Sequence, residues 1–240
     1  MAHIGTSGWS YDHWEGLLYP EGFDSRHRLH AYAASFSTVE LHTGFTHWPP
    51  PAAFDAWRED TPDGFLLSLF AASGPAVGGG MATPEAWAQH IAAAWAALGS
   101  RHGMVLAHLH PELERDEARL DAFLDALPEE VPVAVELRHD SWHVEPVFRL
   151  LERHGASYCV MSGAGLPTVL RPTAERIYLR LHGPDHGAHA PGSYYDDELQ
   201  LWAEHIQGWE DAGHEVFAYF GSDVDGYAVR NAARLVELLA

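Results

Sequence analysis

Short apolar segments alternate with longer amphipathic or alanine-rich ones along the whole chain, and this alternation restricts the fold more than any other feature. Each short segment is apolar or β-branched and is bounded by Gly, Pro or charged residues, as strands are. Strands are predicted at residues 3–8, 37–42, 65–70, 104–110, 131–137, 157–161, 176–182 and 215–220. Eight strands that alternate with helices are typical of a parallel sheet in an α/β fold.

Helical patterns fill most of the intervals between these strands. Helices are predicted at residues 26–36, 51–60, 84–98, 116–127, 143–154, 196–212 and 224–239. Thr83, Pro84 and Glu85 provide an N-cap, a proline in the first turn and an early acidic residue for the third helix. Residues 163–174 form a poor helix because prolines interrupt them. No linker divides the sequence, so we expect one domain over residues 1–240.

The charge balance excludes several kinds of chemistry. The chain has 34 acidic and 14 basic residues, a formal charge of −20, and no lysine. A Schiff base on lysine and a P-loop lysine are therefore excluded. Nucleic-acid binding is disfavoured because such proteins carry basic stripes, although a local basic pocket can still hold a small anion. A GC-rich genome or a saline habitat explains the missing lysine equally well.

The sequence also predicts the cellular location of the protein. No apolar run approaches the roughly 18 residues of a membrane span, and the first residues lack a basic region followed by an apolar run. A single cysteine, Cys159, rules out an internal disulfide and is expected to be a buried structural thiol. We therefore expect a cytoplasmic protein without a membrane partner; nothing in the sequence predicts its oligomeric state.

Four of the predicted strands end in polar residues at positions i and i+2. Side chains two residues apart lie on one face of a strand, and in each case the residue between them is leucine. Buried charges are costly unless paired, so four such pairs predict a site where the strands end. Structural ion pairs inside the barrel, Glu40 with Arg180 or Glu136 with Arg138, are the alternative explanation. The pairs are Glu40 and His42, His108 and His110, Glu136 and Arg138, and Arg180 and His182.

Several of these residues lie within longer motifs of a known family. Residues 4–11 (IGTSGWSY), 36–41 (FSTVEL), 135–142 (VELRHDSW) and 178–184 (YLRLHGP) resemble the domain of unknown function 72 family, in order and over nearly the whole chain. Periodicity alone fits a doubly wound open sheet as well, but the resemblance implies a closed barrel. We therefore expect a single (β/α)8 TIM-like barrel. The resemblance implies no reaction, because the family has no established one.

The chain departs from the family at positions that matter for chemistry. Phe70 stands where members usually carry lysine at the end of the third strand, and Gly221 and Ser222 replace paired asparagines, with Asp223 retained. Residues 42–46 (HTGFT) and 108–111 (HLHP) also differ from the usual motifs. We interpret the chain as a divergent member with another substrate or with altered chemistry.

The first functional hypothesis is an enzyme that acts on a small polar or anionic ligand, such as a phosphorylated or carboxylated metabolite or a sugar. Arg138 and Arg180 would bind a carboxylate or phosphate, and Glu40 or Glu136 would act as general base. His182 would act as general acid or base. Two facing carboxylates also suit glycosidic bond cleavage. The other residues expected to line the site are Trp9, His42, His108, Trp142, Tyr194 or Tyr195, and Asp223.

Two alternatives remain open at this point. A divalent-metal hydrolase or isomerase would draw its ligands from Glu40, His42, His108, His110, Glu136, His182 and Asp223. His-x-His places both rings on one face of a strand, but no stronger motif such as HExxH is present, so no metal ligand set or cofactor is assigned. The third hypothesis is a ligand-binding barrel without catalysis, which a turnover assay would distinguish.

Overall fold

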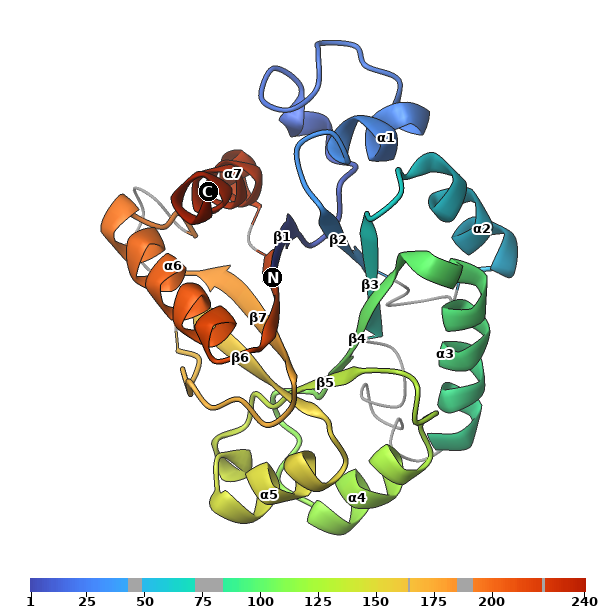
Figure 1. Cartoon of the computed structure of the whole chain (residues 1–240), viewed down its shortest axis with the longest axis vertical. Helices are drawn as coiled ribbons and strands as arrows, with labels where there is room; N and C mark the ends of the chain where they lie inside the picture. The colour runs from blue at the N-terminus through green and yellow to red at the C-terminus, as the bar shows by residue number, and fades with distance from the viewer. Residues whose placement is uncertain (43–48, 72–83, 164, 185–191, 222) are drawn as a thin grey trace.

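The computed structural model describes residues 1–42, 49–71, 84–163, 165–184, 192–221 and 223–240, which form a ring of parallel strands surrounded by helices (Figure 1). The strands are β1 (Ala2–Thr6), β2 (Thr38–His42), β3 (Leu66–Ala71), β4 (His102–His108), β5 (Val133–Glu136), β6 (Ser157–Gly163), β7 (Arg176–Gly183) and β8 (Glu215–Phe220). Their order in the sheet is β1-β8-β7-β6-β5-β4-β3-β2, and all paired neighbours are parallel. The predicted α/β TIM-like barrel is confirmed.

The barrel closes between β1 and β2. Beyond the end of β1, the amide of Gly8 donates to the Glu40 carbonyl at 2.9 Å. The Tyr32 hydroxyl also links the two strands, because it accepts from the amide of Thr6 in β1 at 2.9 Å and donates to the carbonyl of Thr38 in β2 at 3.1 Å. A Cβ on Gly5 would lie 2.2 Å from that carbonyl oxygen, so only glycine permits this close approach.

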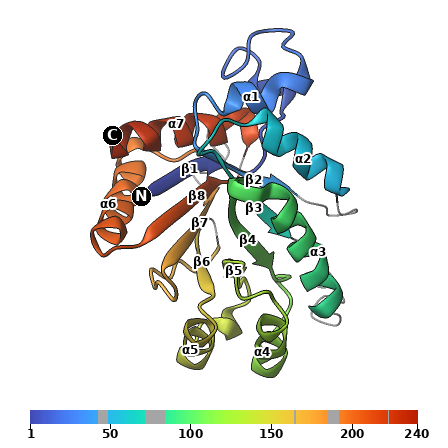
Figure 2. The same ribbon diagram turned by 45° about the vertical axis from the view of Figure 1, so that its right-hand side comes forward.

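Seven α-helices cover the outside of the strands among the described residues (Figure 2). Most bury one stripe; in α6 the buried residues Leu199, Trp202 and Ile206 recur at the spacing of a helix face. The poor helix predicted at residues 163–174 does not form, since residues 165–175 contain no helix. The helices are α1 (Arg28–Tyr32), α2 (Pro51–Asp60), α3 (Pro84–Leu98), α4 (Glu117–Asp125), α5 (Glu145–Arg153), α6 (Asp196–Asp211) and α7 (Tyr227–Leu239).

Several predicted boundaries were wrong: β1 ends at Thr6 rather than at residue 8, and α7 begins at Tyr227 rather than at residue 224. Residues 26–36 form a 3-10 turn at Ser25–His27, followed by the short helix α1, after which hydrogen-bonded turns carry the chain to Phe36. Phe36 is buried in the core, two residues before β2 begins. Strand β4 ends at His108 rather than at residue 110, because His110 turns away to accept a hydrogen bond from the Glu112 amide. The predicted N-cap Thr83 lies outside the described residues.

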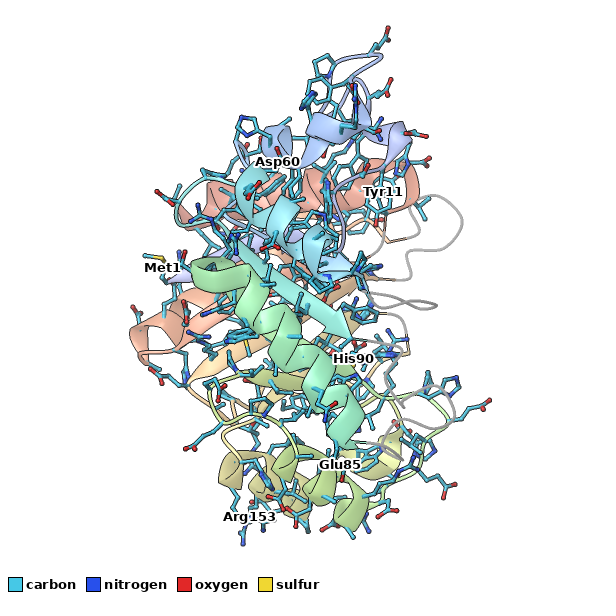
Figure 3. All side chains as sticks on the ribbon, turned by 90° about the vertical axis from the view of Figure 1, so that its right-hand side faces the viewer. Met1, Tyr11, Asp60, Glu85, His90 and Arg153 are labelled. Carbon is cyan, nitrogen blue, oxygen red and sulfur yellow. The ribbon has the colours of Figure 1, made fainter. Side chains whose placement is uncertain are left out.

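The polar residues predicted from the sequence lie at one end of the barrel. Figure 3 shows Met1, which precedes β1, on one side of the molecule and Tyr11, which follows β1, on the other. The carboxyl ends of the strands therefore share the Tyr11 side, where the predicted polar residues also lie. Within the described part of the chain, no helix combines the length and apolarity that a membrane crossing requires.

Candidate functional site

Three buried charges join opposite walls of the barrel at the carboxyl ends of the strands. Arg180 of β7 donates from its NH1 nitrogen to Glu136 Oε2 of β5 at 2.6 Å and from NH2 to Glu40 Oε2 of β2 at 3.0 Å. Both carboxylates are 0% exposed. We call Glu40, Arg180 and Glu136 the buried bridge. Within the buried bridge, the positive charge of Arg180 is paired with the carboxylates of Glu40 and Glu136.

The ionisation of the bridge follows from its contacts. Burial disfavours a charged Glu40, but the Arg180 charge, with His42 and Ser7, outweighs it and lowers the pKa of Glu40 to about 2. The pKa of Glu136 likewise lies well below its ordinary value, because Arg180 and His182 outweigh burial. The two carboxylates raise the pKa of Arg180 despite its burial. The bridge thus holds two negative charges and one positive charge at neutral pH.

Glu136 also holds two side chains that lie nearer the solvent. Its Oε1 atom accepts from Arg138 Nε at 2.8 Å and lies 3.1 Å from His182 Nε2. The NH2 nitrogen of Arg138 is 3.3 Å from the same imidazole nitrogen. The Arg138 side chain is 25% exposed and that of His182 is 17% exposed. One buried carboxylate therefore positions a guanidinium and an imidazole side by side in an outer layer.

Glu40 has its own histidine on the other side of the bridge. His42 Nε2 lies 3.5 Å from Glu40 Oε2, and the His42 side chain is 39% exposed. Ser7 Oγ contacts both Glu40 and the same nitrogen of His42. The Tyr178 hydroxyl donates to Glu40 Oε1 at 2.8 Å. A serine-hydrolase triad uses the two ring nitrogens for different partners, so this arrangement is not one.

Phe70, near the end of β3, packs against the charged and imidazole side chains of the site. Its ring centroid is 4.6 Å from the guanidinium of Arg180, 5.1 Å from the ring of His42 and 5.6 Å from the ring of His108. Burial lowers the pKa of His108 to about 4; Glu136 acts in the opposite direction, and Arg138 and Arg180 add to the lowering. His108 is therefore a neutral imidazole in the wall of the site.

Trp9 follows β1 and lines a separate hollow, and three other predicted ligand-binding residues also lie outside this cluster. Trp142 is fully buried, and its indole nitrogen donates to the Leu113 carbonyl at 2.7 Å. The buried Tyr194 hydroxyl lies 3.0 Å from Ser162 Oγ, between the ends of β6 and β7. Asp223 accepts from the Trp14 indole at 2.9 Å and pairs with His13 at 2.7 Å. These hydrogen bonds and the ion pair hold Trp142, Tyr194 and Asp223 against neighbouring protein groups.

Sequence reasoning missed two residues of the cluster. Tyr178 stands two residues before Arg180 on β7, so extending the i, i+2 rule inward by one step would have found it. Ser7 follows β1 and carries no comparable signal. Its place next to Glu40 depends on how β1 and β2 align across the closure of the barrel.

The residues of the metal hypothesis do not gather around one point. In the ranges that the structure describes, three such ligand atoms come within 4.8 Å of one another only at Asp121, Asp125 and His154. These residues lie on α4 and just after α5, and Asp121 also pairs with Arg153 at 2.9 Å. At the mouth, Arg180 lies between Glu40 and Glu136 instead, and Arg138 pairs with Glu136.

Comparisons with known proteins agree with this fold. Residues 3–240 match the model of the family described as "Protein of unknown function DUF72". The UPF0759 protein YunF of Bacillus subtilis is 26% identical over 270 residues, which cover 100% of this chain and 95% of that protein.

Solved structures show the same architecture. A DUF72 family protein of Thermotoga maritima has a TM-score of 0.83 at 24% identity, with 100% of this chain and 99% of that chain covered. One from Enterococcus faecalis has a TM-score of 0.83 at 18% identity, with 100% and 95% covered. Orotidine 5'-monophosphate decarboxylase of Methanocaldococcus jannaschii, at a TM-score of 0.51 and 11% identity with 100% and 99% covered, shares the barrel alone.

Proposed function

The chain belongs to the DUF72 family of proteins of unknown function. From this premise and the charges at its barrel mouth, we propose that it binds a small anion there, and that His182 takes up a proton on binding which it can then donate to the ligand. The observation that carries the proposal is the shared position of Arg138 and His182 on Glu136. The anion would be a carboxylate or a phosphate group of a small molecule.

The distribution of charge favours Arg138 as the group that meets the anion. Glu40 and Glu136 together balance Arg138 and Arg180, so the four fixed charges sum to zero. Arg180 is enclosed by its two carboxylates, whereas Arg138 is partly exposed. A guanidinium binds carboxylates and phosphates through paired hydrogen bonds. Because its NH2 nitrogen lies beside His182, an anion that accepts from it also contacts the imidazole.

His182 is held in a way that suits proton exchange. Its Nε2 atom faces the buried Glu136, which favours the tautomer with the proton on that nitrogen. The other ring nitrogen lies near Gly221, where a Cβ would be 3.5 Å from Nδ1. The lack of a side chain at residue 221 leaves room for a ligand beside this nitrogen. When an anion arrives, protonation of His182 would compensate the added negative charge.

In this proposal Glu40 and Glu136 are positioning residues. Both are fully buried and engaged by Arg180. A pair of carboxylates that cleaves a glycosidic bond needs direct contact with the sugar. We therefore favour proton exchange at the outer imidazole over direct attack or proton transfer by either carboxylate.

Calorimetry tests the proposal with inorganic phosphate and succinate as probes. We expect wild-type protein to bind at least one of them, and Arg138→Gln to weaken that binding about tenfold or more, as expected for a lost charge-assisted hydrogen bond. Arg149→Gln, on the exposed face of α5, is the matched control and should leave binding unchanged. Equal affinities of wild type and Arg138→Gln would contradict the proposal.

The proton is measured in the same experiment. Repeating the titration in two buffers with different ionisation enthalpies reports the number of protons taken up on binding. We expect uptake in the wild type and its loss in His182→Asn, which keeps a polar side chain but cannot titrate. If uptake persists in His182→Asn, another group carries the proton and this part of the proposal is wrong.

A further inference from the structure

A hollow adjoins the mouth on the side of β1 and β2. It has a volume of 240 Å³ and is lined by residues that follow β1, including Trp9 and Tyr11, by Leu41 and His42 of β2, and by Trp57 of α2. His42 belongs to both the hollow and the charged cluster, because its ring also contacts Ser7 and Glu40. The two spaces are therefore neighbours.

The walls of this hollow are held in place by defined contacts. The Tyr19 hydroxyl donates to the Trp9 carbonyl at 2.5 Å, and the Tyr11 hydroxyl donates to the Ser7 carbonyl at 2.7 Å. Gly8 has φ of +86°, and a Cβ there would lie 2.6 Å from the Tyr11 hydroxyl. The turn after β1 thus requires glycine at this position, and it presents Trp9 and Tyr11 in one arrangement.

The chemistry of the walls is aromatic. The rings of Trp9 and Trp57 meet edge to face, with centroids 5.9 Å apart and planes at 82°. Phe54 supports Trp57 from within, with centroids 5.2 Å apart. Both tryptophans are partly exposed. A planar ring that enters the hollow can stack on one indole and meet the edge of the other, which is the preferred geometry of aromatic groups.

The size of the hollow agrees with such a guest. An apolar cavity of roughly 150 Å³ holds one benzene molecule, so 240 Å³ accommodates one or two fused aromatic rings. The charged group of the same molecule would lie close by, because a single guanidinium, that of Arg180, spans the distance from Glu40 to Glu136. A ligand that joins the two spaces would pass from the hollow, by His42 beside Glu40 and across the buried bridge, to Arg138 beside Glu136.

We infer that the ligand of this barrel is an aryl anion, whose ring enters the hollow between Trp9 and Trp57 while its phosphate or carboxylate group meets Arg138. The inference rests on the anion site proposed above, and it adds the chemical class of the rest of the molecule. It also gives Trp57 a role as a specificity residue.

Three probes separate the ring from the charge: inorganic phosphate, phenyl phosphate and glucose 6-phosphate. We expect phenyl phosphate to bind about tenfold more tightly than inorganic phosphate, the size of a typical aromatic contact with its buried area. Trp57→Ala should remove this gain without changing the affinity for inorganic phosphate, and Trp57→Phe should keep most of it. Trp209→Ala, a partly buried tryptophan on α6, is the matched control and should behave as wild type.

The outcomes distinguish the two proposals. A gain for phenyl phosphate that depends on Trp57 but not on Arg138 would support the aromatic hollow and contradict the anion site. Phosphate binding that depends on Arg138, with no gain from the phenyl ring, would overturn the aromatic hollow alone. An equal gain with glucose 6-phosphate would overturn the aryl class. No binding of any of these probes, with succinate also unbound, would overturn both proposals.

Discussion

The guanidinium of Arg180 lies 4.6 Å from the centre of the Phe70 ring, so the buried cation at the barrel mouth rests on an aromatic face. Its two terminal nitrogens are occupied by Glu136 and Glu40. An aromatic ring attracts a cation through its negative face without carrying charge. Phe70 thus supports Arg180 where related chains were expected to place a lysine.

Replacing Phe70 tests this contact. Phe70→Leu removes the aromatic face and should lower the free energy of unfolding by about 1–3 kcal/mol, through lost packing and a lost desolvated cation–π contact. Phe148→Leu is the matched control, because Phe148 is also buried and lies 4.8 Å from the more exposed Arg171. Urea unfolding should show the larger loss for Phe70→Leu. Equal losses would mean that the Arg180 contact adds nothing to packing.

The buried bridge predicts a strong effect of removing its cation. Arg180→Met leaves two buried carboxylates without their partner, so we expect a loss of about 3–5 kcal/mol in the free energy of unfolding. Adding Glu40→Gln and Glu136→Gln to Arg180→Met should recover part of that loss. Arg149→Met on exposed α5 should change stability by less than about 0.5 kcal/mol. A loss below about 1 kcal/mol for Arg180→Met would contradict the arrangement.

Glu40 should make the protein sensitive to acid. Its pKa falls from 4.5 to about 2 in the folded protein, with burial opposing and Arg180 causing the decrease. The unfolded chain therefore takes up this proton first, and the stabilisation present above pH 4.5 is lost as the pH falls from 4.5 towards 2. Unfolding free energies measured across this window should show a shallower slope in Glu40→Gln than in wild type. Equal slopes would contradict the ion pair.

His108 should make the free energy of unfolding depend on pH in a second, higher range. Burial lowers its pKa from 6.5 to about 4, so the unfolded state binds the proton more readily between these values. Stability should fall as the pH drops from 6.5 to 4, by at most about 3 kcal/mol. His108→Gln should flatten the curve in this range, whereas the exposed His27→Gln should follow the wild type. A wild-type slope in His108→Gln would contradict the burial effect.

Trp142 provides a test of structural against ligand-binding roles. Trp142→Phe removes the hydrogen bond to Leu113 within a buried site and should cost about 1–3 kcal/mol of unfolding free energy. Because the indole is fully buried, phosphate affinity at the mouth should stay unchanged. A change in affinity without a change in stability would assign Trp142 to the ligand site.

The sequence was sufficient to predict the strands and the location of the polar cluster. All eight strands were found, because each is a short apolar run bounded by turn residues. The i, i+2 rule placed Glu40, Glu136 and Arg180 on inward faces. Of the structural ion pairs weighed from the sequence, Glu40 with Arg180 and Glu136 with Arg138 both form. The rule did not predict that Arg180 also joins Glu136, which lies 44 residues away in sequence. Their contact depends on strand alignment around the barrel, which no local pattern encodes.

The role of Trp142 was hidden for a similar reason. Its position just after a strand end suggested a pocket wall, but the 3-10 turn at Asp140–Trp142 directs the indole into the protein. Short irregular turns after strands decide whether a side chain faces the ligand or the core. Their geometry depends on tertiary partners such as the Leu113 carbonyl, 29 residues earlier in the sequence.

The buried bridge limits the order in which this barrel can change. A substitution at Glu40, Arg180 or Glu136 alone leaves an unmatched charge out of reach of water, whereas a matched set of substitutions can be neutral. Mutational paths through this mouth are therefore epistatic. A new specificity would be acquired more readily at the outer residues Arg138, His182 and Trp57, leaving the buried bridge as it is.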